Sequence, residues 1–489
     1  MHEEPLNLLG IPPEDWAATP ESVRLALLSL LDIVRAQSGQ LATLQTEVRE
    51  LQTKLRQNSR NSSKPPSSDP PSAPPKPPKV LRGRNAGGQP GHPGSSRPLV
   101  PPERVDEPIE LLPDQCPTCA QVFARDLPTL AGPHRTQVFE LPVVQPHIIE
   151  YRQHTRCCPT CRQFVTAELP ADAPPGGFGP RATALIALLR GRFRLSIDDT
   201  AECLAELWNL PLCSASVVTS CARVSAAIAP LDAAIAELVQ AAPSRNVDET
   251  SWPTATRRGW LWVAVSPLAT CFRIQQSRSP PALRALLGEA YYGIVGSDRY
   301  VAYNQLATRN RQLCWAHLIR NLRGLLEEER AATCWAARLL EQSDELFLAW
   351  QLYKGGWVDR VSLQMALLPV RQAMRGQRQE GAGGADPKIA GFSQELLKYW
   401  DALWTFSQVE GIEPTNNAAE QALRHAVLWR KSSFGSRSAA GCRFVERILS
   451  VHATCRQQGR SFFKLVTEAV RAAWAGQPGP VLSRPSAIA

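Results

Sequence analysis

The sequence predicts a multidomain α+β protein, and three patterns along its 489 residues support this fold class. A heptad of apolar residues near the N-terminus indicates a coiled coil, and two Cys-x-x-Cys pairs indicate a zinc ribbon. From Arg245 the apolar period changes to two, which favours strands that then alternate with helices. We therefore expect these segments: a helical, leucine-zipper region at 1–57, a Pro-rich basic linker at 58–107, the zinc-binding ribbon at 108–172, a helix-turn-helix-like helical domain at 178–240, an α/β domain at 241–435 with a helical insertion at about 322–410, and a C-terminal helical region at 436–489.

Composition and charge restrict the function classes. No run approaches the roughly 18 apolar residues of a membrane span, and the start lacks the features of an export signal, so we expect a cytoplasmic protein without a membrane partner. The formal net charge is +9, but residues 54–97 and 424–460 carry +8 and +7, so the remainder is acidic. Two basic islands favour a polyanionic partner, nucleic acid first, and a solubilising basic surface is the alternative.

The expected N-terminal helix repeats its apolar residues every seven positions. One heptad position holds Leu27, Val34, Leu41, Val48 and Leu55, and the other holds Leu30, Leu44 and Leu51, with Gln37 as the break. This pattern predicts a self-associating zipper, and an amphipathic helix that packs within the chain is the alternative. Between Pro65 and Pro102 there are 13 prolines, which predict an extended basic linker or spacer able to lie along phosphates.

Two cysteine pairs follow the linker. Cys116 and Cys119 form the first knuckle and Cys158 and Cys161 the second, with 38 residues between them. Four thiolates at this spacing predict a structural Zn²⁺ site that folds a small module without doing chemistry, with Cys157 outside the ligand set. The apolar alternation in 137–151 predicts the strands of the ribbon.

The next stretch has a helical period. We expect helices at 181–193, at 196–207 with Ser196 as the N-cap, and from Ser214 to about Ala229. A short helix, a tight turn and a Ser-capped helix are the outline of a DNA-binding helix-turn-helix, although many small helical bundles share it.

The segment after Arg245 predicts a sheet. Strands are expected at 246–252, 259–265, 270–274, 293–297 and 311–314, and helices at 280–289, 300–306 and from Trp315 onward. Three meandering strands followed by alternating helix and strand is the order of a ribonuclease H-like sheet. In that order Asp248 and Asp298 lie on neighbouring strands. Because side chains alternate, Asp248 and Glu249 point to opposite faces, so only one of them can share a site with Asp298.

A third acid would complete a site for two divalent cations that cleaves a phosphodiester. Our candidate is Glu420, which a Pro-Thr-Asn-Asn turn places in the first turn of a helix. Three oxygen ligands of this kind suit Mg²⁺ or Mn²⁺. The alternative is structural, since Asn417 as N-cap with Glu420 three residues later is also the pattern of a capping box.

Several stretches together resemble the bacterial insertion-sequence transposases of family sixty-six. They are NSRNSSKPPSSD at 58–69, GGQPGHPG at 87–94, both CPTC knuckles, VDET at 247–250, GSDRY at 296–300, CWAH at 314–317 and TNNAAE at 415–420. The resemblance covers nearly the whole chain in the same order. It implies DDE transposition by a ribonuclease H-like catalytic domain, with Asp248, Asp298 and Glu420 as the acidic triad. It also implies that double-stranded DNA, both the element's terminal inverted repeats and the target, is the partner.

Further DNA contacts are predicted outside the triad. Cys314 and His317 lack a second ligand pair nearby, so we do not assign zinc there. The resemblance suggests that they lie near the active site, beside the cut DNA, and a buried Cys on a strand with a hydrogen-bonded His is the alternative. We also expect His317 and Arg320 to contact DNA. Arg430 and Lys431 belong to the second basic island, where interleaved aromatic residues favour phosphate binding. The zipper predicts a homodimer or higher oligomer, and small accessory proteins of the same element are further possible partners. Two rival functions stay open: a non-catalytic zinc-containing DNA-binding protein, and a nuclease of the same fold that does not join strands.

Overall fold

The computed structural model describes residues 12–58, 61, 69, 97–289, 291–327 and 333–482. The chain divides into two compact units, one comprising the described residues of 1–73, 151–201 and 213–489, and the other those of 74–150 and 202–212. Most of the predicted linker, including GGQPGHPG, lies outside the described residues.

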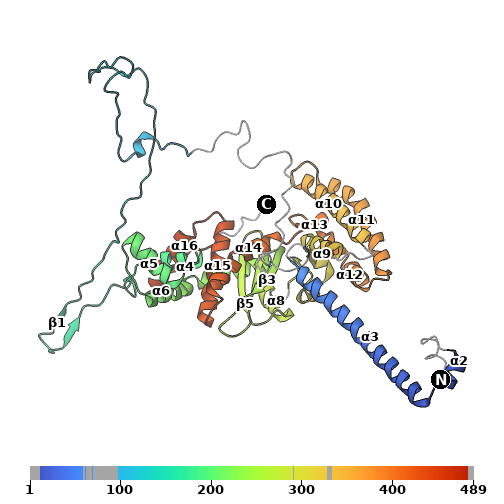
Figure 1. Cartoon of the computed structure of the whole chain (residues 1–489). Coiled ribbons are helices and arrows are strands. Elements are labelled where there is room, and N and C mark those ends of the chain that lie inside the picture. The colour runs from blue at the N-terminus through green and yellow to red at the C-terminus, as the bar shows by residue number, and fades with distance from the viewer. Residues whose placement is uncertain are drawn as a thin grey trace. The chain divides into compact units, whose positions relative to one another are not determined.

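A five-stranded mixed sheet forms the centre of the first unit (Figure 1). Its strands are β3 (Ser244–Ser251), β4 (Trp260–Val265), β5 (Thr270–Gln275), β6 (Ile294–Ser297) and β7 (Arg311–Leu313), in the order β5-β4-β3-β6-β7. The pairs β3–β4 and β4–β5 are antiparallel, whereas β3–β6 and β6–β7 are parallel. All five strands lie where the period of two predicts them, and the predicted pairing of the first strand with the fourth is confirmed.

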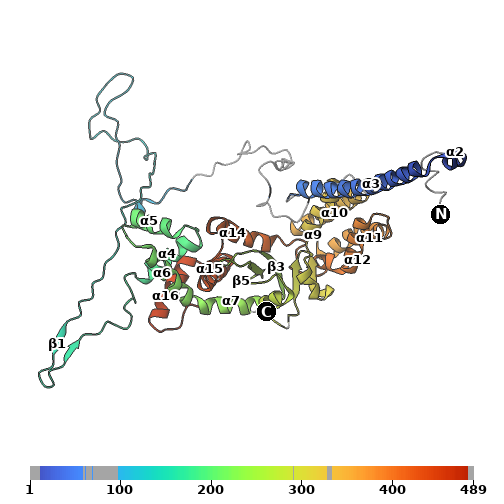
Figure 2. The same ribbon diagram turned by 60° about the horizontal axis from the view of Figure 1, so that its bottom comes forward.

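Helix α15 (Ala439–Gln457) covers one edge of this sheet, beside β5 (Figure 2). The N–H groups of Thr270, Phe272 and Ile274 would otherwise be unpaired edge donors, and each donates to a side chain of α15. The acceptors are Thr454, Ser450 and Glu446, at 3.1, 2.9 and 2.7 Å. The donors are two residues apart along β5 and the acceptors four residues apart along α15. These spacings match, because two strand residues advance about 6.7 Å and four helix residues about 6 Å. The helix therefore closes the edge.

Helices before the sheet follow the predicted pattern closely. They are α4 (Pro180–Gly191), α5 (Ile197–Trp208), α6 (Ser214–Ala227) and α7 (Ala229–Ala241). Ser196 caps α5 as predicted: its Oγ accepts from the N–H of Asp199 at 2.9 Å, and the Asp199 carboxylate accepts from the N–H of Ser196 at 3.2 Å. No single helix of the described residues is long and apolar enough to cross a membrane, although α6 and α7, bent by 49°, meet that criterion as a pair.

Between β7 and the third predicted acid, the chain forms the expected helical insertion. Its helices are α9 (Trp315–Glu327), α10 (Thr333–Lys354), α11 (Arg360–Ala382), α12 (Pro387–Lys398) and α13 (Thr405–Gln408). Their core is aromatic: the Trp315 and Trp404 rings meet edge to face at 5.6 Å, and both side chains are fully buried. The remaining elements are α8 (Pro280–Leu287), α14 (Asn417–Ser433), α16 (Phe462–Trp474), the short N-terminal helix α2 (Pro13–Ala18) and the single-turn 3₁₀ helices η2 (Pro102–Arg104), η3 (Val301–Gln305), η4 (Thr308–Asn310) and η5 (Asp401–Leu403).

Helix α3 spans Glu21–Arg56 without a break, which confirms the predicted N-terminal helix (Figure 1). Its heptad residues are left exposed: Leu41 and Leu44 are 58% and 59% exposed. The alternative, an amphipathic helix that packs within the chain, is not supported at these positions.

The strands predicted at 137–151 are wrong. This stretch has no strand, and the short strands β1 (Thr155–Cys157) and β2 (Phe164–Thr166) instead pair around the second cysteine knuckle. Val138 and Leu141 are almost fully exposed. The alternation was real, but a strand needs a neighbour for its backbone groups, and none of the described residues pairs with this stretch.

Candidate active site

Asp248 lies in β3, and Asp298 directly follows the adjacent parallel strand β6. The β3–β6 register pairs Ser244 with Ile294 and Asn246 with Gly296. Two residues further along each strand, the same register leads to Asp248 and Asp298. The burial of β3 alternates, with Arg245, Val247 and Glu249 buried and Asp248 half-buried. Asp248 therefore lies on the face opposite to Glu249, as predicted. It also lies near the same end of the parallel strands as Asp298, where ligands bind in open α/β sheets.

Glu249 is buried on the other face and is fully engaged there. Its carboxylate accepts from Arg278 Nε at 2.6 Å and from the hydroxyl of Tyr303. The Arg278 guanidinium in turn lies over the Tyr300 ring, 3.5 Å from its centroid. The GSDRY segment thus supplies Asp298 to the candidate site. Its Tyr300, together with Tyr303, supports Glu249 and Arg278 on the other face of the sheet. These contacts give Glu249 a structural role.

Asn416 joins the start of α14 to β3. Ile294 N–H donates to the Pro243 carbonyl (2.9 Å), so alternate carbonyls of β3, including that of Val247, face β6. The ladder ends at Asn246–Gly296, and the Asn416 side-chain amide donates to the Val247 carbonyl at 2.8 Å. This fully buried side chain thus continues the ladder one residue before Asp248. This bridge was not predicted from the sequence, in which its only signal is the first of the two Asn residues in the turn before Glu420.

The same turn is fixed to the end of β7. Asn416 N–H donates to the Cys314 sulfur at 3.2 Å, and Trp315 N–H donates to the Pro414 carbonyl at 2.9 Å. Asn416 is also the N-cap of α14, but its side chain makes no capping bond. Glu420 does not reach back to the helix start and instead contacts Arg320. The capping-box alternative for Asn417 and Glu420 is therefore wrong.

Glu420 is held by Arg320 of α9 and lies near His317 of the same helix, whose buried Nδ1 has no hydrogen-bond partner among the described residues. Arg320 Nη2 donates to Glu420 Oε1 at 2.9 Å, and His317 Nδ1 lies 3.6 Å from the same oxygen. Burial, followed by the Arg320 charge, lowers the pKa of His317, while Asp298 and Glu420 act in the opposite direction. His317 and Arg320, predicted to contact DNA, thus lie beside the predicted third acid.

Ligand atoms of Cys314, His317 and Glu420 lie within 4.8 Å of one another, a spacing that could hold a metal ion. Burial raises the pKa of Cys314 to about 11, so its thiol keeps a proton near neutral pH. Its sulfur already accepts a hydrogen bond from Asn416, and Arg320 contacts the Glu420 carboxylate. Hydrogen bonds engage Cys314 and Glu420, whereas His317 Nδ1 is buried without a partner in the part of the chain that the structure describes. Because the Cys314 thiol keeps its proton, we assign no zinc to this group.

Negative charge is concentrated around Asp248. Burial and then the charges of Glu249, Asp298 and Glu420 raise its pKa well above the ordinary value for aspartate. The carboxylates are thus close enough to act on one another, and their repulsion disfavours the ionised form. Carboxylate oxygens are the donors that Mg²⁺ and Mn²⁺ prefer, and a divalent cation would relieve the repulsion. The chemistry of the three acids fits such an ion. Among the described residues, however, the group of ligand atoms within 4.8 Å of one another is Cys314, His317 and Glu420, so the three acids are not drawn together to that distance.

The predicted phosphate-binding residues Arg430 and Lys431 differ in their surroundings. Arg430 Nη1 donates to Thr250 Oγ1 at 2.9 Å and to Ser251 Oγ at 2.6 Å, so this guanidinium attaches α14 to the end of β3. Lys431 is exposed. Arg299, next to Asp298, turns to Glu395 and to Asn321, whose Oδ1 accepts at 3.0 Å.

The two cysteine knuckles fall in different units, and each folds in the same way. In the first, Ala120 N–H donates to the Cys116 carbonyl (2.9 Å) with Ala120 at φ 56°; in the second, Arg162 N–H donates to the Cys158 carbonyl (2.9 Å) with Arg162 at φ 62°. Backbone N–H groups of Thr118 and Cys119 lower the pKa of Cys116, and those of Cys161 and Thr160 lower the pKa of Cys158. Turns that stabilise a thiolate suit a metal ligand.

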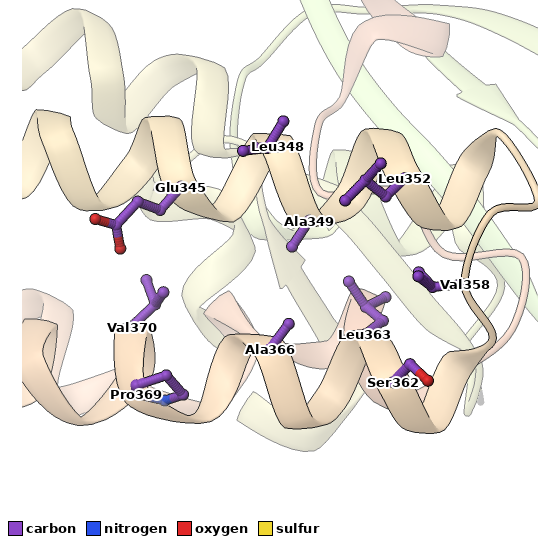
Figure 3. A pocket seen from close by; sticks show the side chains of 10 residues that line it. All are labelled: Glu345, Leu348, Ala349, Leu352, Val358, Ser362, Leu363, Ala366, Pro369 and Val370. Atoms are coloured by element: carbon purple, nitrogen blue, oxygen red, sulfur yellow. The ribbon is translucent and has the colours of Figure 1, made fainter.

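A separate cavity of 310 Å³ lies between α10 and α11 (Figure 3). Its lining is Glu345, Leu348, Ala349, Leu352, Val358, Ser362, Leu363, Ala366, Pro369 and Val370. One carboxylate among apolar side chains offers neither a metal-ligand set nor an acid–base pair. The chemistry-bearing residues therefore lie at the strand ends and not in this cavity.

Comparison with known proteins agrees with the geometry. Residues 12–98 match a family of unknown function (DUF6444), and residues 175–443 match the Transposase IS66 family. No curated protein sequence is significantly similar to the chain. The second match covers more than half of the chain and includes the sheet, the insertion and all three predicted acids. The protein belongs to the IS66 family of transposases.

Proposed function

We propose that this transposase cuts the ends of its insertion sequence and joins them to target DNA, with Asp248, Asp298 and Glu420 as the catalytic acids. The observation that carries the proposal is the position of Asp248 in β3 and of Asp298 directly after the adjacent parallel strand β6, with the charges of Asp298 and Glu420 both raising the pKa of Asp248. The strand order β5-β4-β3-β6-β7 supports a ribonuclease H-like assignment for this domain.

The three carboxylates would hold Mg²⁺ or Mn²⁺. When bound, such ions supply an activated nucleophile and neutralise charge on the phosphodiester. The chain itself contributes the positions of the three carboxylates. Asn416 fixes the start of α14 against β3, and Arg320 of α9 orients the carboxylate of Glu420, with His317 beside it. When DNA binds, the guanidinium of Arg320 can exchange its hydrogen bond to the Glu420 carboxylate for one to a DNA phosphate.

We further propose that the four knuckle cysteines share one structural Zn²⁺. Two observations support this assignment: both knuckles have the same turn conformation, and the pKa values of Cys116 and Cys158 are lowered. A closed four-thiolate site would fold a module that helps to bind the element's ends. Small accessory proteins of the element remain proposed partners.

Helix α3 is the proposed dimer contact. Replacing Leu41 and Val48 by Glu would bury charge in the zipper, and we expect the dimer to weaken by several kcal/mol. Analytical ultracentrifugation of the full chain measures this change. As a matched control, Ala36→Glu with Thr43→Glu adds the same charge away from the heptad positions and should leave the dimer intact. A wild-type chain that stays monomeric at micromolar concentration would exclude the zipper.

A cleavage and joining assay tests the function as a whole. The substrate is a labelled duplex that carries the terminal inverted repeat found beside the gene, mixed with a target plasmid. With Mg²⁺ we expect a cut at the repeat end and then a labelled plasmid. Tight binding without a cut in Mg²⁺ or Mn²⁺ would favour the non-catalytic DNA-binding protein, and a cut without a joined product would favour the nuclease.

A further inference from the structure

A group of basic and imidazole side chains gathers where the end of α4 meets α14 and α15. Arg194 Nη1 lies 2.8 Å from His425 Nδ1, and Arg192 Nη1 lies 3.4 Å from the same nitrogen. The rings of His425 and His452 stack with centroids 6.0 Å apart. With Arg456 of α15, these residues form what we call the arginine–histidine cluster.

The contacts define the tautomer of His425. A guanidinium only donates hydrogen bonds, so Nδ1 must be the acceptor. Nε2 then carries the proton and can donate to the Gly191 carbonyl, which lies 3.3 Å away. Burial lowers the pKa of His425 to about 4, and the two arginines act in the same direction although the Gly191 bond opposes them, so the ring is neutral near pH 7. His425 therefore orients two guanidinium groups without neutralising either.

The positive charge of the cluster is unopposed. After burial, the charges of Arg194 and Arg456 lower the pKa of Arg192. The charges of Arg192 and Arg456 likewise lower the pKa of His452. Among the described residues, no ion pair includes Arg192, Arg194 or Arg456. Like charges held together repel one another, and an anion would relieve that repulsion.

The backbone around the cluster is firmly placed. A Cβ at Gly191 would lie 2.2 Å from the Ile448 side chain, so only glycine lets α4 approach α15 this closely. Arg194 adopts a left-handed φ of 64°, which turns the chain sharply between α4 and α5. Two arginines on a fixed turn lose less side-chain freedom on binding than arginines on a mobile loop.

We propose that the arginine–histidine cluster binds a backbone phosphate of the element's DNA, outside the scissile position. This inference rests on the proposed transposase function. Guanidinium groups pair with phosphate oxygens in a fixed, often bidentate geometry. Glu420 and His425 are five residues apart on α14 and hence about 140° apart around it, on opposite flanks of the face that α14 buries. The cluster therefore contacts flanking duplex while the acids act on the cut strand.

The test compares DNA binding by full-length variants over a series of salt concentrations, using the terminal-repeat duplex and an unrelated duplex. For Arg192→Gln with Arg194→Gln we expect binding to both duplexes to weaken about tenfold, and the slope of log K against log salt to fall by about 1. The pair Arg338→Gln and Arg375→Gln removes two exposed arginines of the insertion and should change neither quantity.

Two variants of His425 separate phosphate binding from a structural role. His425→Glu would place a carboxylate against both arginines, so it should hold them in place yet weaken binding as much as their removal. His425→Gln keeps an uncharged acceptor and should retain binding. If Arg192→Gln/Arg194→Gln binds DNA with the affinity and the salt slope of the wild type, phosphate binding by the arginine–histidine cluster is excluded. In that case, cleavage by the wild type would still support the transposase function. A wild type that neither binds nor cuts the terminal duplex would overturn the proposed function itself.

Discussion

Asp248→Asn is expected to lower strand cleavage on the order of 10³-fold, about 4 kcal/mol of transition-state stabilisation, while end binding stays within about twofold. The catalytic step requires the carboxylate, whereas binding depends on basic surfaces elsewhere. Without added metal, the variant should also unfold at a temperature no lower than the wild type, because Asn removes one of four carboxylates that repel one another. Cleavage of labelled end DNA, a gel-shift and thermal unfolding measure the three quantities.

Glu249→Gln is the matched control on the adjacent residue. Its side chain supports Arg278 and Tyr303 in the core, so the free energy of unfolding should fall by about 1–3 kcal/mol while cleavage remains. The two neighbours should thus show opposite behaviour, one stable and inactive, the other less stable and active. If Glu249→Gln is inactive and Asp248→Asn cuts DNA, the assignment of the two faces of β3 is reversed.

Cys116→Ser and Cys158→Ser are each expected to release the zinc of the full-length chain and to unfold the module around the knuckles. Structural zinc contributes on the order of 10–16 kcal/mol to the folding of small zinc domains, so loss of one thiolate should be decisive. Zinc content after gel filtration and limited proteolysis within residues 97–172 measure the two effects.

Cys157 offers a control of equal chemistry one residue away. It is exposed, and its thiol contacts the carbonyls of Cys158 and Arg162. Cys157→Ser should therefore keep one zinc per chain and the wild-type proteolysis pattern. If the Cys116→Ser variant retains its zinc, the four-thiolate assignment is wrong. If the Cys157→Ser variant loses its zinc, Cys157 is one of the ligands.

Local patterns were sufficient to predict the strands of the sheet and the places of Asp248 and Asp298 in it. Alternation identifies the strands, and the order of strands and helices places Asp298 beside Asp248. Alternation also separates Glu249 from the shared face before any contact is known. The prediction failed at 137–151, where an alternating stretch finds no partner strand in the part of the chain that the structure describes, since pairing depends on residues distant in sequence.

The contacts that complete the candidate site could not be predicted, because they join distant segments. Asn416 bonds to Val247, 169 residues earlier, and Arg320 bonds to Glu420, 100 residues later. The contact of His425 with Arg194 is of the same kind. In the sequence these residues look like a turn, a helix surface and an isolated histidine, and only packing brings them together.

The most direct test of the central claim, that the acids hold the reacting metal ions, is a change of metal preference in Asp298→Cys. Sulfur binds Mg²⁺ poorly and softer transition metals better. We predict that the wild type cuts end DNA with Mg²⁺, Mn²⁺ or Co²⁺, whereas Asp298→Cys is inactive with Mg²⁺ and regains cleavage with Mn²⁺ or Co²⁺. Equal cleavage by Asp298→Cys and the wild type in Mg²⁺ would contradict metal binding by Asp298 and, with it, the proposed site.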